Sequence, residues 1–225
     1  MTYPDENSST FMARRWKALV IPAILCFVVL PPFLHGAAGE NKKPAFVVID
    51  PGHGGIDSGT RSSNGVDEKT ITLAVAGDMV PLLKRDDINF VLTRDRDKYV
   101  SLNQRVQITD RPGDRLLLSI HCDYFKQRGM RGFTVLYAQG ASHDSCVAAH
   151  RIAAGLIHEG FTCHDVRMDT RGLEVLDKSN CPAVLVELGF MSDPHDLRYL
   201  TSKSGQDRLA AGLVRGLEAY LSKIK

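Results

Sequence analysis

Four side chains of this sequence could together hold and use a metal ion: His53, Glu68, His121 and Glu187. Zinc in hydrolases is commonly bound by three nitrogen or oxygen ligands, and a fourth position is left to water. Two histidines and one glutamate would supply such a set, and a second glutamate nearby could accept a proton from the water. The residue types alone do not say which of Glu68 and Glu187 binds the metal and which acts as the base.

The elements that precede these residues should place them at one edge of a sheet. Phe46 to Ile49 is an apolar run too short for a helix, and the glycine-rich turn that ends it displays His53. A second apolar run ends at His121 and a third at Glu187, while Glu68 opens a helix. In open α/β sheets, ligands collect at the C-terminal ends of the strands. The sequence therefore predicts that all four residues meet at that edge.

Each of these residues also has a plain structural explanation when it is taken alone. His53 could hydrogen-bond a neighbouring backbone group in its turn, and His121 could be a satisfied core histidine. Glu68 would favour a helix N-terminus simply through its charge. Glu187 is harder to explain in this way, because a carboxylate that follows a buried run usually has a partner or a function.

The rest of the chain alternates strands with helices. Further strands are expected at residues 88–93, 115–121, 132–138, 173–176 and 183–187, and helices from about residue 68 and at residues 101–109, 142–159 and 206–223. This order predicts an α/β fold, with a mostly parallel twisted sheet of about six strands and helices on both faces. Pro81 should kink or shorten the helix that begins near Glu68.

Residues 1–38 have the pattern of a secretory signal peptide, with Met12 as an alternative start. Three basic residues precede an apolar run at residues 18–34, and small residues follow it. Prolines inside the apolar run argue against a stable membrane-spanning helix. Residues 39–44 would then be a short leader and residues 45–225 the catalytic domain of a periplasmic or otherwise exported protein.

Composition excludes several classes of function. Without residues 1–38 the chain keeps 25 basic and 24 acidic side chains, a net charge of +1 that gives no support to nucleic-acid binding. The sequence contains no G-x-S-x-G elbow, so it does not indicate a serine hydrolase.

Cys122 should face away from the site if its neighbour His121 faces it. The four cysteines of the expected domain allow three pairings, and their spacing selects none: Cys122, Cys146, Cys163 and Cys181. The other five histidines are expected on the solvated surface: His143, His150, His158, His164 and His195.

An ordered set of motifs resembles the zinc-dependent N-acetylmuramoyl-L-alanine amidases of bacterial cell-wall turnover. The matching stretches are Val48-Ile-Asp-Pro-Gly-His-Gly-Gly55 with Asp57 and Gly59, Glu68-Lys-Thr-Ile-Thr-Leu-Ala74, Leu92-Thr-Arg94, Leu102-Asn-Gln-Arg105, Ser119-Ile-His-Cys-Asp123, and Pro182-Ala-Val-Leu-Val-Glu-Leu-Gly-Phe-Met-Ser-Asp193. Each is weak alone, but together they span nearly all of residues 45–223 in the family's order.

The resemblance implies roles that the residue types left open. The family's ligands for one zinc ion map onto His53, Glu68 and His121, and its catalytic glutamate maps onto Glu187. It implies hydrolysis of the amide between the lactyl group of muramic acid and L-alanine in peptidoglycan, for cell-wall remodelling or daughter-cell separation. Cys122 departs from the alanine that is usual after the second histidine.

The resemblance also leads to expectations about control and to two rival readings. The chain between Cys146 and Leu173 is too short for the long regulatory helix of some members, so we expect a bare catalytic domain, monomeric, and either constitutively open or controlled by a protein activator. A wall-binding domain without turnover and a zinc peptidase that cuts within the stem peptide remain alternatives. Intact site residues weigh against the first, and the second differs only in the bond that is cut.

Overall fold

Six strands and six helices make up the part of the chain that the computed structural model describes, which comprises residues 46–109, 113–126 and 129–223. The expected signal segment 1–38 and leader 39–44 lie outside these ranges. The strands are β1 (Phe46–Pro51), β2 (Asn89–Leu92), β3 (Asp114–Asp123), β4 (Phe133–Tyr137), β5 (Cys163–Met168) and β6 (Ala183–Phe190). The helices are α1 (Glu68–Arg85), α2 (Leu102–Thr109), α3 (His143–His158), α4 (Glu174–Asp177), α5 (Pro194–Leu200) and α6 (Lys203–Leu221).

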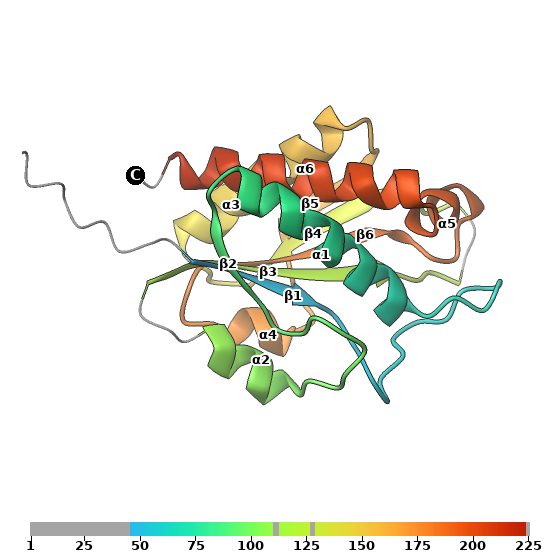
Figure 1. Cartoon of the computed structure of the whole chain (residues 1–225), viewed down its shortest axis with the longest axis horizontal. Coiled ribbons are helices and arrows are strands. Elements are labelled where there is room, and N and C mark those ends of the chain that lie inside the picture. The colour runs from blue at the N-terminus through green and yellow to red at the C-terminus, as the bar shows by residue number, and fades with distance from the viewer. Residues whose placement is uncertain (1–45, 110–112, 127–128, 224–225) are drawn as a thin grey trace, which may run out of the picture. The chain divides into compact units, whose positions relative to one another are not determined.

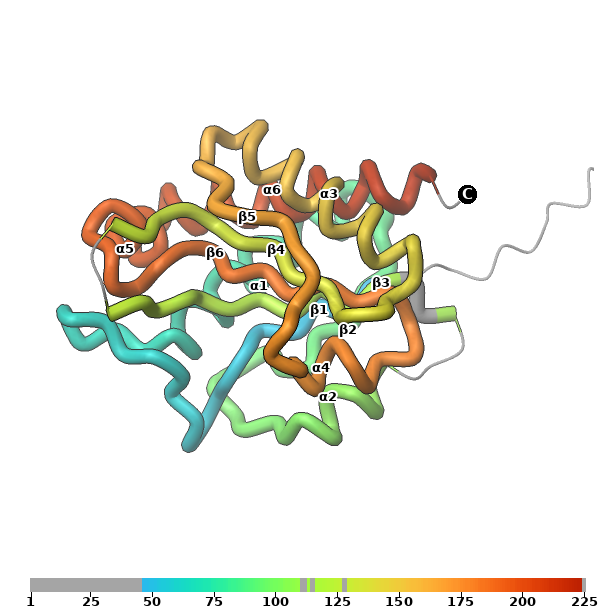
Figure 2. Tube along the Cα trace, turned by 180° about the vertical axis from the view of Figure 1, so that it is seen from behind, coloured from blue at the N-terminus to red at the C-terminus, as the bar shows by residue number. Residues whose placement is uncertain are grey.

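The strands form a single sheet in the order β2-β1-β3-β6-β4-β5. The first four of these are parallel to one another, whereas β4 pairs antiparallel with β6, and β5 runs parallel to β4. Figure 2 shows β6 between β3 and β4. The predicted mostly parallel sheet of six strands is confirmed, and β1, β3 and β6 point their C-terminal ends at one edge.

Helices cover both faces of the sheet, as predicted. Figure 1 shows α1, α3 and α6 on one face and α2 and α4 on the other. Because both faces are covered, the central strands are apolar on both sides. In β1, Val47 and Ile49 belong to the core beneath α1, α3 and α6, while Val48 belongs to the core on the opposite face. None of the helices in the described ranges is both long and apolar enough to cross a membrane.

The structure differs from the expected elements at four points. Residues 173–176 form no strand, because Val175 and Leu176 are the buried side of the short helix α4. The sixth strand is β5 instead, an edge strand whose sequence Cys-His-Asp-Val-Arg-Met has no apolar run to reveal it. Pro81 does not shorten α1, which continues to Arg85 and buries Leu83 completely. Helix α5, which the sequence analysis did not predict, is capped by the Asp193 carboxylate.

Candidate metal centre

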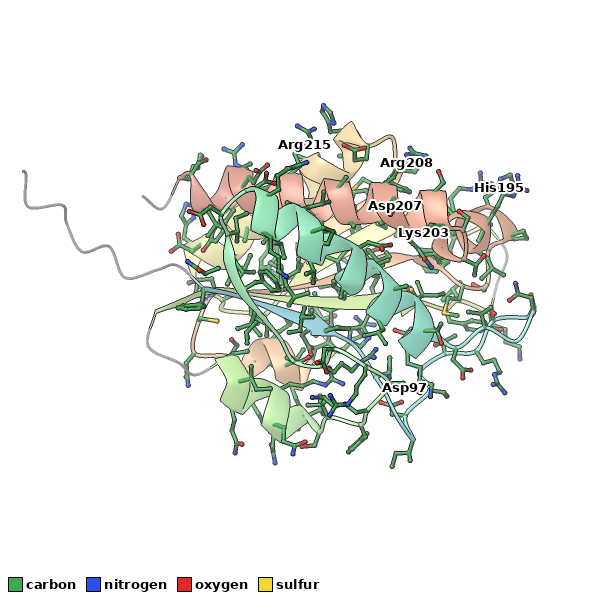
Figure 3. The ribbon with its side chains drawn as sticks, viewed as in Figure 1. Asp97, His195, Lys203, Asp207, Arg208 and Arg215 are labelled. Carbon is green, nitrogen blue, oxygen red and sulfur yellow. The ribbon has the colours of Figure 1, made fainter. Side chains whose placement is uncertain are left out.

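His53 stands in a turn of left-handed backbone directly after β1. Its φ angle is 59°, and those of Gly54 and Gly55 are 129° and 60°. Residues other than glycine rarely adopt positive φ, and such strain often marks a functional site. The turn is tied to its surroundings by Asp97, labelled in Figure 3, whose carboxylate accepts hydrogen bonds from Gly55 N at 2.7 Å and Lys69 Nζ at 2.8 Å.

Two glycines leave the room that the histidine rings occupy. A Cβ atom at Gly52 would lie 2.2 Å from Cε1 of His121. A Cβ atom at Gly59 would lie 2.6 Å from Cδ2 of His53 and 2.7 Å from Oε2 of Glu68. All three distances are shorter than those that real Cβ atoms show, so these positions require glycine for steric reasons.

Glu68 brings the two histidines together. It is the first residue of α1 and is 2% exposed. Its Oε2 lies 3.2 Å from Nε2 of His53, and its Oε1 lies 3.0 Å from Nδ1 of His121. One nitrogen or oxygen atom from each of the three residues lies within 4.8 Å of the others. The structure thus assembles the three residues that the family resemblance marked as ligands.

The charges in this cluster depend on one another. Burial raises the pKa of Glu68, but hydrogen bonds from His121 and His53 outweigh it and hold that pKa well below its usual range. Burial lowers the pKa of His53, but Glu68 and then Asp57 more than offset this and raise it to about 9. Without a cation, the His53 imidazole therefore carries protons on both nitrogens and is positively charged at neutral pH. A metal ion that binds here must displace one of these protons.

Asp57 fixes the orientation of the first histidine. Its Oδ2 lies 2.9 Å from Nδ1 of His53, and its Oδ1 accepts a hydrogen bond from Gly59 N at 3.1 Å. When Nδ1 of His53 donates to Asp57, Nε2 is left to face Glu68 and a metal. A carboxylate behind a histidine is the usual support of a metal-binding imidazole.

Glu187 lies beside this cluster but is not part of the ligand group. On β6 it pairs in parallel register with His121 of β3 and, on its other side, with Thr134 of β4. It is 8% exposed, and burial raises its pKa to about 7, with His121 opposing the shift and Asp123 adding to it. A carboxyl group that titrates near neutrality suits proton transfer. The geometry therefore favours Glu68 as the ligand and Glu187 as the base.

The donor set fits a zinc ion with an open position. Two imidazoles and one carboxylate are typical ligands of catalytic zinc. All four predicted residues line a cleft of about 510 Å³, together with Asp57, Gly59, Thr60, Cys122, Asp123 and Tyr124. The cleft leaves room for water and for a substrate in front of the ligands.

The sequence of this chain matches a known protein family. A sequence profile described as N-acetylmuramoyl-L-alanine amidase matches residues 47–219. The chain belongs to this amidase family. A probable cell wall amidase, LytH of Staphylococcus saprophyticus, is 34% identical over 191 residues, which cover 81% of this chain and 62% of that relative.

Solved structures of amidases share the fold. The crystal structure of the N-acetylmuramoyl-L-alanine amidase from Clostridium difficile 630 has a TM-score of 0.76 and 31% identity, over 81% of this chain and 99% of that one. The CwlD amidase from Clostridioides difficile, solved in complex with the GerS lipoprotein, has a TM-score of 0.71 and 24% identity, over 80% of this chain and 99% of that one.

In this amidase-family chain, a buried arginine that the sequence analysis did not assign a role supports the site. Arg94 is fully buried, although arginine is among the residues least often found there. It donates hydrogen bonds to the carbonyl oxygens of Pro51 at 2.9 Å, Gly52 at 2.8 Å and Lys69 at 2.8 Å. Arg94 thus ties the end of β1, which leads to His53, to the first turn of α1.

A second buried arginine holds the His53 backbone from the opposite face. Arg105 of α2 donates to the Asp50 carboxylate, to the Pro51 carbonyl oxygen at 2.9 Å and to the His53 carbonyl oxygen at 2.7 Å. Asp50 is 1% exposed and also accepts a hydrogen bond from Ser119 at 2.8 Å. Both arginines lie in motifs that the sequence analysis matched, but their burial could not be read from the sequence.

The remaining histidines lie on the surface, as the sequence analysis predicted. The other five histidines are all exposed. Cys122 is buried, and burial raises the pKa of its thiol well above the ordinary value, which makes it a poor nucleophile. Its backbone N–H donates to Oε1 of Glu68 at 2.9 Å. None of the four cysteines in the described ranges forms a disulfide.

Proposed function

We propose that this protein is a zinc-dependent N-acetylmuramoyl-L-alanine amidase, which hydrolyses the amide between the lactyl group of muramic acid and L-alanine in peptidoglycan. The observation that carries the proposal is the meeting of His53, Glu68 and His121 at one edge of the sheet, with Glu187 in register beside His121. The family match over residues 47–219 supports the choice of substrate.

The chemistry is divided between three ligands and one base. His53, Glu68 and His121 would hold a single zinc ion, which would supply Lewis-acid stabilisation of the charge that develops on the amide oxygen. Glu187 would remove a proton from the attacking water and pass it to the nitrogen of the leaving L-alanine. Its pKa, which burial raises to about 7, allows both steps near neutral pH.

The proposal extends to the setting of the enzyme. Residues 1–38 would be removed on export, and the protein would act in the periplasm or elsewhere outside the cytoplasm. The name of the staphylococcal relative, a probable cell wall amidase, supports this placement. We further propose that the mature chain is a monomer and that a protein activator regulates it; CwlD, which shares the fold, was solved in complex with a lipoprotein.

Digestion of purified peptidoglycan tests the central proposal. The mature protein with zinc should release free stem peptides that begin with L-alanine and carry no muramic acid, and a chelator should abolish this release until zinc is restored. Mass spectrometry of the products distinguishes the alternatives. Fragments cut within the stem would show a peptidase, and glycan binding without any release under zinc-replete conditions would show a wall-binding domain.

A further inference from the structure

An arginine side chain lies beside the carboxylate of Glu187. Arg171, in the turn between β5 and α4, places Nη2 at 3.8 Å from Oε1 of Glu187. This separation gives an ion pair without a direct hydrogen bond. Glu187 is 8% exposed whereas the Arg171 side chain is 48% exposed, so water screens the attraction from the arginine side only.

Arg171 is itself fixed by a buried carboxylate. Asp169 is 3% exposed, and its Oδ1 accepts a hydrogen bond from Nε of Arg171 at 3.0 Å. Its Oδ2 accepts the backbone N–H groups of Arg171 at 3.2 Å and Leu173 at 3.0 Å. The Asp169 N–H donates to the Tyr137 carbonyl oxygen at 2.7 Å, at the end of β4. The guanidinium is thereby anchored to the sheet along its Nε edge while Nη2 reaches Glu187.

A second arginine of the same segment forms an ion pair that has no buried carboxylate partner. Arg167 pairs with Asp165 at 3.1 Å, again two residues apart, but both side chains are 45% exposed. Exposed pairs of this kind contribute little to stability or order. The Arg171 side chain is 48% exposed, much like that of Arg167, so the difference lies in the burial of Asp169 and in the presence of Glu187 on the far side of Arg171.

We propose that Arg171 is a positioning residue for Glu187. Asp169 holds the guanidinium, and the guanidinium restrains the Glu187 carboxylate in the orientation from which it meets the attacking water. Arginine suits this role because its planar fork can serve two carboxylates at once. The inference rests on the proposed function, since it assumes that Glu187 is the base.

Steady-state kinetics on a soluble muramyl peptide tests the role. Arg171→Ala should lower kcat by about tenfold to a hundredfold, because small misplacements of a reacting group cost this much. KM should stay within about twofold. Arg171→Lys keeps the charge but not the fork and should recover part of kcat. Arg167→Ala, the matched control, should leave kcat, KM and bound zinc unchanged.

A double-mutant cycle separates action through Glu187 from action on the substrate. Glu187→Asp withdraws the carboxylate by one methylene and should retain a residual rate. In that background Arg171→Ala should cost much less than in the wild-type protein. An undiminished cost, a rise in KM alone, an unchanged kcat or a loss of zinc from Arg171→Ala would each overturn the inference.

The two proposals fail in different ways. If the wild-type protein cleaves the lactyl amide and Arg171→Ala is fully active, only the positioning role is wrong. If the wild-type protein cleaves a bond within the stem peptide, the assigned substrate bond is wrong, and the same cycle still decides the role of Arg171 for that bond. If the wild-type protein cleaves neither, both proposals are overturned.

Discussion

Glu187 and His121 stand side by side on the parallel strands β6 and β3, paired in register at the edge where both side chains enter the cleft. This relationship divides the site between a residue suited to holding a metal and one suited to moving a proton. Two parallel strands in adjacent positions can deliver such a pair with little dependence on loop geometry.

Replacing Glu187 with Gln should abolish turnover while leaving zinc bound. The amide keeps the size of the side chain but cannot accept the proton, so the rate should fall by about a hundredfold to ten-thousandfold. Metal analysis of the purified variant should still give about one zinc ion per chain. Loss of zinc in this variant would reverse the roles assigned to Glu68 and Glu187.

The same substitution should stabilise the metal-free protein at alkaline pH. In the folded state the pKa of Glu187 is raised from 4.5 to about 7, so stability falls as pH rises from 4.5 through 7, where the folded protein must release a proton that the unfolded chain has already lost. Glu187→Gln removes this penalty, which is up to about 3 kcal/mol for such a shift. Urea unfolding in chelator should show the gain at pH 8 but hardly at pH 4. The exposed Glu174→Gln should show no such difference, and an equal gain at both pH values would contradict the explanation.

Substitution of Gly59 by alanine should damage metal binding. The added Cβ would meet the ring of His53 and the carboxylate of Glu68, and the φ angle of +64° adds backbone strain. Gly65 offers a matched control, because its φ is +84° and nothing lies within 4 Å of an added Cβ. Both variants should lose about 1 kcal/mol of folding stability from left-handed strain. Competition with a zinc-sensitive dye should show weaker zinc binding for Gly59→Ala alone, and equal affinities would contradict the steric argument.

Asp50→Asn should destabilise the fold strongly. It leaves the buried Arg105 without its carboxylate partner, a change that costs about 3 to 5 kcal/mol in buried ion pairs. Arg96→Ala breaks an ion pair with Asp95 whose side chains are 72% and 63% exposed, and it should change stability by less than about 0.5 kcal/mol. Thermal unfolding of the two variants gives the comparison. A mild effect of Asp50→Asn would show that the backbone carbonyls alone satisfy Arg105.

The ends of the apolar strands could be predicted from the sequence because each strand leaves a clear signal. Glu187 directly follows an apolar run, His53 follows one after a short turn, and His121 ends a largely apolar strand; a parallel sheet brings such ends together. Strand β5 gave no signal, because an edge strand that is half exposed can be built from polar residues. The buried positions of Arg94 and Arg105 were equally hidden, since local sequence does not show that several backbone carbonyls will converge on one guanidinium. Arg171 escaped notice because its only distinction is a three-dimensional one, its closeness to Asp169 and Glu187.

The contacts of Arg94 and Arg105 have a consequence for how the enzyme gains and loses activity. Both arginines donate hydrogen bonds to backbone carbonyl oxygens at the end of β1 and to no side chain of the ligand set. The backbone that carries His53 is therefore held in place without a bound ion. We expect stripping and reloading of zinc to be a rapid, reversible event that requires no refolding.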